Sequence, residues 1–187
     1  MLIAKLNGFC SLGMPTPVLM DWVVISAYSS AAWLCLRAKV IASRLSNKKE
    51  AHFWWLIACL VLILGINKFL YFENCITYGL SNLAHSDGWY ESRRTFQAEF
   101  IVLIIFLLTC LLLGILYALK NFQWALRSAA IAFVLLLFLV ILRTVSLHQI
   151  DELIFPDILG IGIGINWIVE LICNLWIGLS AFIYLKR

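Results

Sequence analysis

Apolar runs of about twenty residues recur along the whole chain, and the short stretches between them hold most of its charge. A helix needs roughly 20 apolar residues to cross a hydrocarbon core about 30 Å thick. Five runs meet this requirement, over about 18–36, 53–72, 98–119, 129–148 and 159–184. Because 64% of the 187 residues are hydrophobic and 13% are charged, no single soluble core can hold the apolar surface. The sequence predicts an all-α integral membrane bundle that forms one domain over residues 1–187.

The positions of the basic residues predict how this bundle is oriented. Nine of the 14 lysines and arginines follow the first span, separate the third from the fourth, or end the chain. They are Arg37, Lys39, Arg44, Lys48, Lys49, Lys120, Arg127, Lys186 and Arg187. Cytoplasmic segments carry such an excess, so we expect the N-terminus outside and the C-terminus in the cytoplasm. Charge spread over helix ends in this way does not form the dense basic face that binds nucleic acid.

The connection over 73–97 is expected to form an amphipathic segment on the outer surface. Its second half concentrates aromatic and basic residues: Arg93 and Gln97 are spaced i, i+4, as are Tyr90 and Arg94. Each pair therefore shares one face of a helix. Two guanidinium groups at headgroup level suit a phosphate or carboxylate of a lipid or a lipid-linked sugar. The alternative is an aromatic-belt anchor whose arginines snorkel toward the headgroups.

Ionisable residues within or next to the predicted spans gather toward one side of the membrane. In the predicted topology they project to the outer half or the midplane, whereas the cytoplasmic halves of the spans are nearly pure hydrocarbon. These residues are Asp21, Lys68, Glu99, Arg143, His148 and Glu170. A charge in lipid is costly unless it is paired or hydrated, so such residues face the bundle interior or a water-filled cavity. We therefore expect a polar cleft that opens to the outside.

The last span carries a polar stripe, because Asn166, Glu170 and Asn174 are spaced i, i+4, i+8. A hairpin between the fourth and fifth spans brings Arg143 to about the level of residue 167, so we predict an ion pair between Arg143 and Glu170. Either this pair binds or converts a substrate, or it locks two helices together. The predicted ligand-binding residues of the cleft are Lys68, Arg93, Arg94, Gln97, Arg143, Asn166 and Glu170.

His148 and Asp151 lie close together after the fourth span, and a histidine beside a carboxylate can act as a general base, a metal ligand or a pH sensor. With Glu170 they are the candidate catalytic residues. The candidate metal ligands are His85, His148 and Asp151. The chain has only three histidines, whereas a closed zinc site takes several His or Cys ligands, so the sequence disfavours a metal site. The identity of any cofactor stays open.

Four motifs resemble those of a group of small bacterial polytopic inner-membrane proteins without an assigned activity. They are G-I-N-K at 65–68, G-W-Y-E-S-R-R at 88–94, S-L-H-Q-I-D at 146–151, and N-W with a following Glu at 166–170. The resemblance covers roughly 53–178. It implies four or five helices in a bacterial inner membrane, with these motifs on the outer side, and it implies no reaction. Gln149 stands where the group has a second histidine, which further disfavours a metal site.

These features together predict an inner-membrane protein whose outward-facing polar cleft binds a lipid-like ligand or docks a membrane partner. Membrane lipids are the expected partners, and another membrane protein or a second copy of the chain are further candidates. Two alternatives stay open. One is a membrane-embedded hydrolase or transferase, with or without a metal. The other is a proton-coupled transporter, which a midplane Glu170 suits, although the chain lacks the inverted repeats of many transporter folds.

Overall fold

The structure, a computed structural model, describes residues 19–70, 93–145 and 165–186. Within these ranges, the side chains of 93–98, 100, 101, 142–145, 165 and 166 lie outside the description. The described residues form five helices and no strand, which confirms the predicted all-α class. The helices are α2 (Leu19–Arg44), α3 (Lys48–Leu70), α5 (Arg93–Ala118), α6 (Trp124–Val145) and α8 (Ile165–Leu185).

Four of these helices, α2, α3, α6 and α8, are long and apolar enough to cross a membrane. The remaining helix, α5, has a shorter apolar part among the described residues, which covers Val102–Ala118. Large apolar side chains cover the outside of the bundle, for example Ile63, Phe106 and Leu179, each more than half exposed. Soluble monomers rarely expose so much continuous apolar surface, whereas a lipid-facing surface requires it.

The helices α2, α3, α5 and α6 are longer than the predicted spans, most clearly at the first connection. We expected a basic loop after residue 36, but α2 continues to Arg44 and α3 already begins at Lys48. The turn itself is short: Ser46 has a positive φ of 57°, and the Asn47 side chain accepts a hydrogen bond from the backbone N–H of Glu50 at 3.4 Å. Lysine and arginine are good helix formers with long apolar stems, so the helix can continue until their charges reach the headgroups.

The second turn connects α5 with α6, and α6 begins at Trp124 rather than at the predicted 129. Arg127 stabilises this turn, because its guanidinium donates to the carbonyl oxygen of Leu119 at 2.9 Å and to that of Lys120. These carbonyls follow the end of α5 and have no partner further along that helix. A residue that we interpreted as a topology signal therefore also acts as a helix cap.

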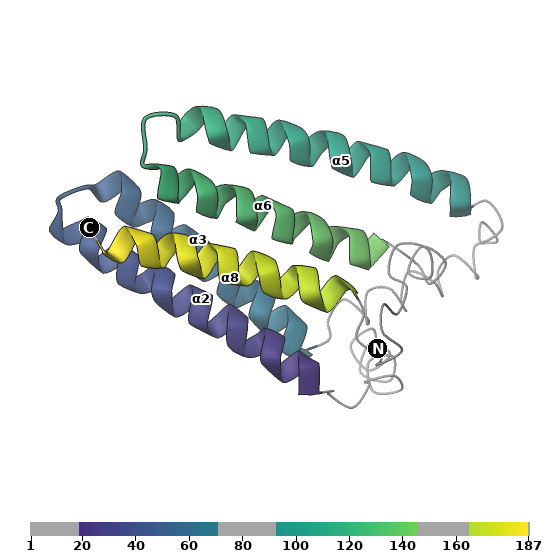
Figure 1. Ribbon diagram of the computed structural model, residues 1–187. Coiled ribbons are helices and arrows are strands. Elements are labelled where there is room, and N and C mark those ends of the chain that lie inside the picture. The colour runs from purple at the N-terminus through teal and green to yellow at the C-terminus, as the bar shows by residue number, and fades with distance from the viewer. Residues whose placement is uncertain (1–18, 71–92, 146–164, 187) are drawn as a thin grey trace, which may run out of the picture.

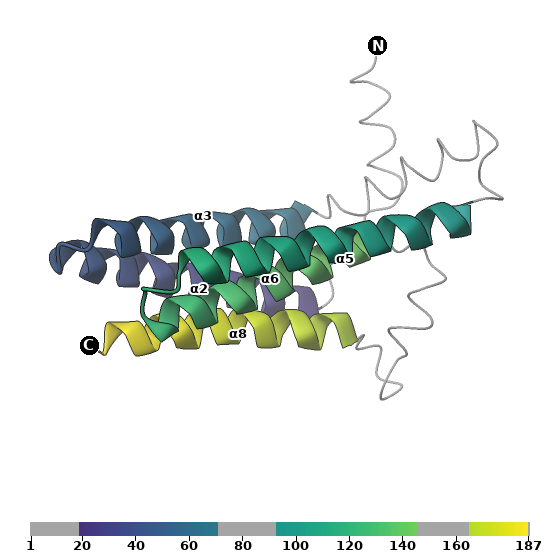
Figure 2. The ribbon, with the colours of Figure 1, turned by 90° about the horizontal axis from the view of Figure 1, so that it is seen from above.

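The helices α2, α3, α6 and α8 pack around a common core, and α5 lies on the outer side of α6 (Figures 1 and 2). In this bundle α8 runs between α2 and α6. The core includes Tyr28, Trp54, Leu126, Leu136 and Ile177, which are almost completely buried. Small residues of α2 fill the rest of its inner face, including Ala31, Ala32, Ala38 and Ala42. This pattern is typical of tightly packed membrane helices.

Two described glycines allow close contacts between helices. A Cβ atom added at Gly65 of α3 would lie 3.0 Å from Cβ of Tyr28 on α2. A Cβ atom added at Gly178 of α8 would lie 3.3 Å from Cδ1 of Leu34, also on α2. The absence of side chains at these positions lets α3 and α8 approach α2 from two sides. Gly65 in particular brings α3 against the part of α2 that carries Tyr28.

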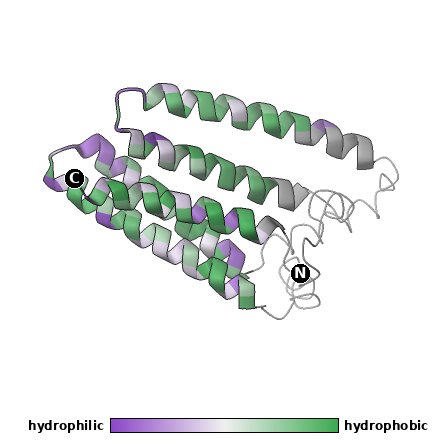
Figure 3. Cartoon of the chain, viewed as in Figure 1, coloured by the Kyte–Doolittle hydropathy of each residue, from purple (hydrophilic) through white to green (hydrophobic). Residues whose placement is uncertain are grey.

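One end of the bundle, called here the hairpin end, consists of the 45–47 turn, the 119–123 turn and the C-terminal end of α8 (Figure 1). Hydrophilic residues gather at these turns, whereas the helices between the two ends are mostly hydrophobic (Figure 3). The basic residues of the hairpin end include Arg44, Lys48, Lys49, Lys120 and Lys186. Their grouping at one end agrees with the predicted pattern of topology signals.

Candidate functional site

A buried carboxylate joins three helices near the end opposite the hairpin end. Glu170 of α8 is 7% exposed, and each of its carboxylate oxygens has a partner on another helix. Lys68 of α3 lies with Nζ 3.1 Å from Oε2, which makes a buried salt bridge. Tyr28 of α2 donates its hydroxyl hydrogen to Oε1 at 2.7 Å. We call Tyr28, Lys68 and Glu170 the charged triad.

The sequence places Glu170 in the interior through the periodicity of α8. Trp167, Glu170 and Asn174 are spaced i, i+3, i+7 and therefore share one face of the helix. Asn174 is 1% exposed and donates its side-chain N–H to the backbone carbonyl of Glu170 at 2.9 Å. Ile177 and Ala181 continue the same face into the apolar core. One helix face therefore changes from polar to apolar along its length, and the polar part lies toward the Lys68 end.

Pairing explains how charge can lie at this depth. Lys68 is 3% exposed, so neither its ammonium group nor the Glu170 carboxylate has much contact with solvent. An isolated ion in such surroundings would cost several kcal/mol, and its partner offsets this cost only with good geometry and further hydrogen bonds. The Tyr28 hydroxyl supplies one such hydrogen bond. Glu170 therefore faces the bundle interior, and its charge is balanced by Lys68 of another helix.

The basic partner of Glu170 among the described side chains is Lys68, and the predicted pair between Arg143 and Glu170 stays a prediction. In the structure Lys68 of α3 and Tyr28 of α2 occupy both carboxylate oxygens of Glu170. The side chain of Arg143 lies outside the description, although its backbone belongs to α6. The prediction considered only the helix that precedes α8 in the sequence, which forms the other arm of the predicted hairpin. The rotation of α8 instead turns Glu170 toward α2 and α3, which the sequence pattern of one helix does not specify.

The charged triad has hydrogen-bonding capacity that its described neighbours do not use. The Lys68 ammonium has three N–H groups, and one acceptor, Glu170, lies near it in the described part of the chain. The buried indole N–H of Trp167 and the buried Oδ1 of Asn174 also have no hydrogen-bond partner among the described residues. Buried polar groups are normally paired, so these atoms indicate a site that can hold water or a polar ligand group.

The remaining predicted site residues are distributed as follows. His85, His148 and Asp151 lie outside the described residues, and so do the side chains of Arg93, Arg94, Gln97 and Asn166. Asp21 is buried in the first turn of α2. Glu99 of α5 is exposed, which contradicts the expectation that it faces the bundle interior. It lies in the second turn of a helix that packs mainly on α6, so its carboxylate stays outside the four-helix core.

Within the described ranges, no three His, Cys, Asp or Glu residues form a group that could hold a metal ion.

A further buried carboxylate lies at the hairpin end, and the sequence pattern did not predict it. Glu50 of α3 is 5% exposed and accepts a hydrogen bond from the Tyr184 hydroxyl of α8 at 2.6 Å. The Tyr184 ring also packs edge-on against Trp54, with 5.4 Å between ring centroids. Glu50 precedes the predicted second span, so the expectation that the cytoplasmic halves of the spans are nearly pure hydrocarbon did not include this carboxylate. Glu50 was assigned to a loop because the start of α3 was placed five residues too late.

A third polar contact joins α6 to α8. Trp176 donates its indole N–H to the Ser128 hydroxyl at 2.7 Å, and the Ser180 hydroxyl lies 3.1 Å from the same oxygen. Interhelical hydrogen bonds of this kind stabilise packing in lipid, where apolar contacts alone give little preference for one neighbour. This contact has no charge and no unused buried atom, so we interpret it as structural.

The fold and the site define the class of this protein as a polytopic α-helical membrane protein with a buried interhelical charge pair. Comparison with protein-family models, with curated proteins and with solved structures found no match to the chain. The charged triad and its surroundings therefore carry the functional argument by themselves.

Proposed function

We propose that this chain is a membrane-embedded binding protein whose charged triad recognises the polar headgroup of a lipid-like amphiphile. One observation carries the proposal: a buried ion pair lies beside buried hydrogen-bonding atoms that no described residue uses. Lys68 and Trp167 offer donors, and Asn174 offers an acceptor. A phosphate or carboxylate would accept from the donors, and a hydroxyl or amine would donate to the Asn174 oxygen.

The amphiphilic character of the proposed ligand follows from the surroundings of the triad. The site lies between apolar helices, and the outer surfaces of these helices are apolar as well. A ligand with a polar headgroup and a hydrocarbon tail matches both environments, because its tail can remain in lipid while its headgroup is bound. Arg93, Arg94, Gln97, Arg143 and Asn166 belong to the proposed site on sequence grounds, since they bring the same chemistry toward this end.

The membrane and the side from which the ligand enters are part of the proposal. The positive-inside rule assigns the hairpin end to the cytoplasm, so the charged triad lies toward the outer side. The resemblance of four motifs to those of small bacterial inner-membrane proteins is the reason for proposing a bacterial inner membrane. The alternative form of this proposal is that another membrane protein docks at the end of the bundle that carries the charged triad. Such a partner would use the same polar groups.

Mass spectrometry of co-purified molecules tests this function. Protein purified in mild detergent is expected to retain an amphiphile, and the double variant Lys68→Met/Glu170→Leu is expected to lose it while it stays helical. The double variant removes both charges together, so no unpaired charge is left in the core. The matched control is Ser128→Ala/Ser180→Ala, which removes the polar contact between α6 and α8 and should retain the ligand. Equal retention by all three proteins would refute the proposal.

The contact between Glu170 and Lys68 also favours a second candidate function, proton-coupled transport. Protonation of Glu170 would remove the charge that holds Lys68, so proton binding could change how α3 and α8 pack. If the protein is such a transporter, a proton gradient should drive uptake of the amphiphile into proteoliposomes. The variant Glu170→Gln should abolish this uptake. Gradient-driven uptake that persists in Glu170→Gln would eliminate this role of the residue.

A further inference from the structure

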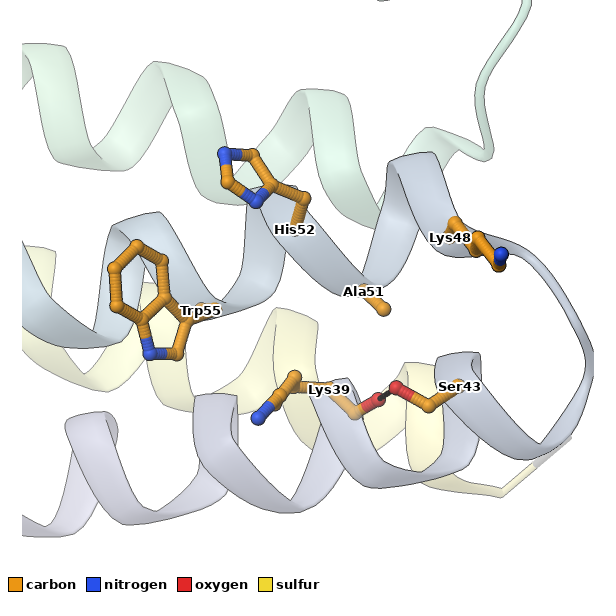
Figure 4. Close-up of a pocket in the computed structure, with 6 residues that line it drawn as sticks. All are labelled: Lys39, Ser43, Lys48, Ala51, His52 and Trp55. Atoms are coloured by element: carbon orange, nitrogen blue, oxygen red, sulfur yellow. Dashed lines mark hydrogen bonds between the residues drawn. The ribbon is translucent and has the colours of Figure 1, made fainter.

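A basic pocket lies between α2 and α3 at the hairpin end, far from the charged triad along the same two helices. Its volume is about 530 Å³, and it is open to the surroundings. Lys39 and Ser43 of α2 line one side of this pocket, and Lys48, Ala51, His52 and Trp55 of α3 line the other (Figure 4). The Ser43 hydroxyl donates to the backbone carbonyl of Lys39 at 2.9 Å, which fixes this turn of α2.

The charge of the pocket is uncompensated by the side chains that line it. Lys39 and Lys48 are its two cations, and no acidic residue is among its lining residues. Glu50 is adjacent in sequence, but its buried carboxylate is bound by Tyr184 of α8. The ion pair found among the described residues joins Lys68 to Glu170 and involves neither pocket lysine. The pocket is therefore a region of positive potential that an anion can neutralise.

The pocket lies at the level where lipid headgroups meet the hydrocarbon core. Lys39 and Lys48 lie close to the 45–47 turn, and the partly exposed ring of Trp55 borders them on the core side. Tryptophan and snorkelling lysine side chains are typical of this level. Below Trp55, Cys59 and Leu62 follow at i+4 and i+7 on the same face of α3, and both remain at least partly accessible. This face gives an acyl chain an apolar path away from the pocket.

We propose that this pocket binds the headgroup of an anionic phospholipid from the leaflet that borders the hairpin end. The phosphate would lie in the pocket that Lys39 and Lys48 line, and one acyl chain would follow Trp55, Cys59 and Leu62 along α3. Basic pockets between membrane helices are suited to such headgroups, because the low dielectric nearby strengthens the attraction. This site is separate from the charged triad and does not rest on the function proposed for it.

Lipid retention measured by native mass spectrometry tests the proposal. The protein is reconstituted in nanodiscs of phosphatidylcholine with a minority of phosphatidylglycerol. The lipids that stay bound to the protein after its release from the nanodisc are counted. The wild type is expected to retain phosphatidylglycerol in preference to phosphatidylcholine. The variant Lys39→Gln/Lys48→Gln is expected to bind phosphatidylglycerol about tenfold more weakly, since two cations near the headgroup are lost. The variant Lys39→Arg/Lys48→Arg keeps the charge and should keep the preference.

The matched control is Arg44→Gln/Lys49→Gln. These two residues belong to the same end of α2 and α3 and are exposed, but they do not line the pocket. This control removes the same charge and should keep affinity within about twofold of the wild type. Equal losses in the two Gln variants would assign the preference to diffuse surface charge and overturn the proposal. Displacement of the lipid by millimolar inorganic phosphate would also overturn it, in favour of a soluble phosphate ligand.

Discussion

At the scale of single residues, the carboxylate of Glu170 depends on its two partners in different ways. The salt bridge to Lys68 balances charge, and the Tyr28 hydroxyl satisfies the second oxygen. Loss of one charge leaves the other unpaired in the core, whereas loss of both leaves an apolar contact. The coupling between the two charged residues is therefore expected to be large.

The first prediction concerns this coupling. Lys68→Met and Glu170→Leu should each lower the free energy of unfolding by about 3–5 kcal/mol, and the double variant should lose clearly less than their sum. Denaturant titration in micelles, analysed as a double-mutant cycle, measures the difference. Additive effects of the two substitutions would show that the ion pair contributes no coupling.

The second prediction concerns the Glu50 carboxylate at the hairpin end. Tyr184→Phe removes the hydroxyl that donates to Glu50 but keeps the ring against Trp54. A hydrogen bond to a buried charged group contributes about 1.5–3 kcal/mol, so stability should fall by this amount. Tyr117→Phe is the matched control, because Tyr117 is 72% exposed, and it should change little. Equal unfolding midpoints for the two variants would contradict the assigned role of Tyr184.

At the scale of elements, α3 and α8 approach α2 closely at Gly65 and Gly178, and the α2 atoms that face these two glycines differ in how freely they can move. The Tyr28 Cβ atom that faces Gly65 is attached directly to the backbone and cannot move independently of α2. The Leu34 methyl group that faces Gly178 is the end of a flexible side chain. Gly114 of α5 has no heavy atom within 4 Å of an added Cβ. These three positions form a graded series in which only the packing differs.

The third prediction follows from this series. Gly65→Ala should lower the unfolding free energy by about 1–3 kcal/mol, since it overpacks the contact with α2. Gly178→Ala should cost less, and Gly114→Ala should be neutral or slightly stabilising, because alanine favours the helix. Gly65→Ala should also weaken ligand retention at the charged triad, because it displaces Tyr28. Thermal unfolding of the three variants in one detergent measures the order, and a reversed order would contradict the packing described here.

At the scale of the whole molecule, both helix turns and the end of α8 lie at the same end of the bundle (Figure 1). The side of the membrane that this end faces is set by the basic residues around these turns. A helix pair inserted the opposite way would place the basic pocket and the charged triad in the wrong leaflets. One labelling experiment therefore bears on both proposed sites.

The fourth prediction is that the hairpin end faces the cytoplasm. In a background without the six natural cysteines, Leu45→Cys and Asn121→Cys mark the two turns. A membrane-impermeant maleimide should label both positions in lysed cells and neither in intact ones. Labelling of both in intact cells would reverse the orientation, and labelling of only one would contradict the arrangement in which the turns share an end.

The helical class, the approximate helix positions and the basic hairpin end follow from the sequence alone, because lipid requires long apolar segments whose backbone hydrogen bonds are satisfied internally. The burial of Glu170 is also predictable, since a charge in lipid needs a partner. Its choice of Lys68 and Tyr28 is decided by the tertiary structure. That choice depends on how far α8 is rotated and on how closely Gly65 lets α3 approach α2. The contact between Glu50 and Tyr184 has the same origin, because it joins residues 134 positions apart that only the packed bundle brings together.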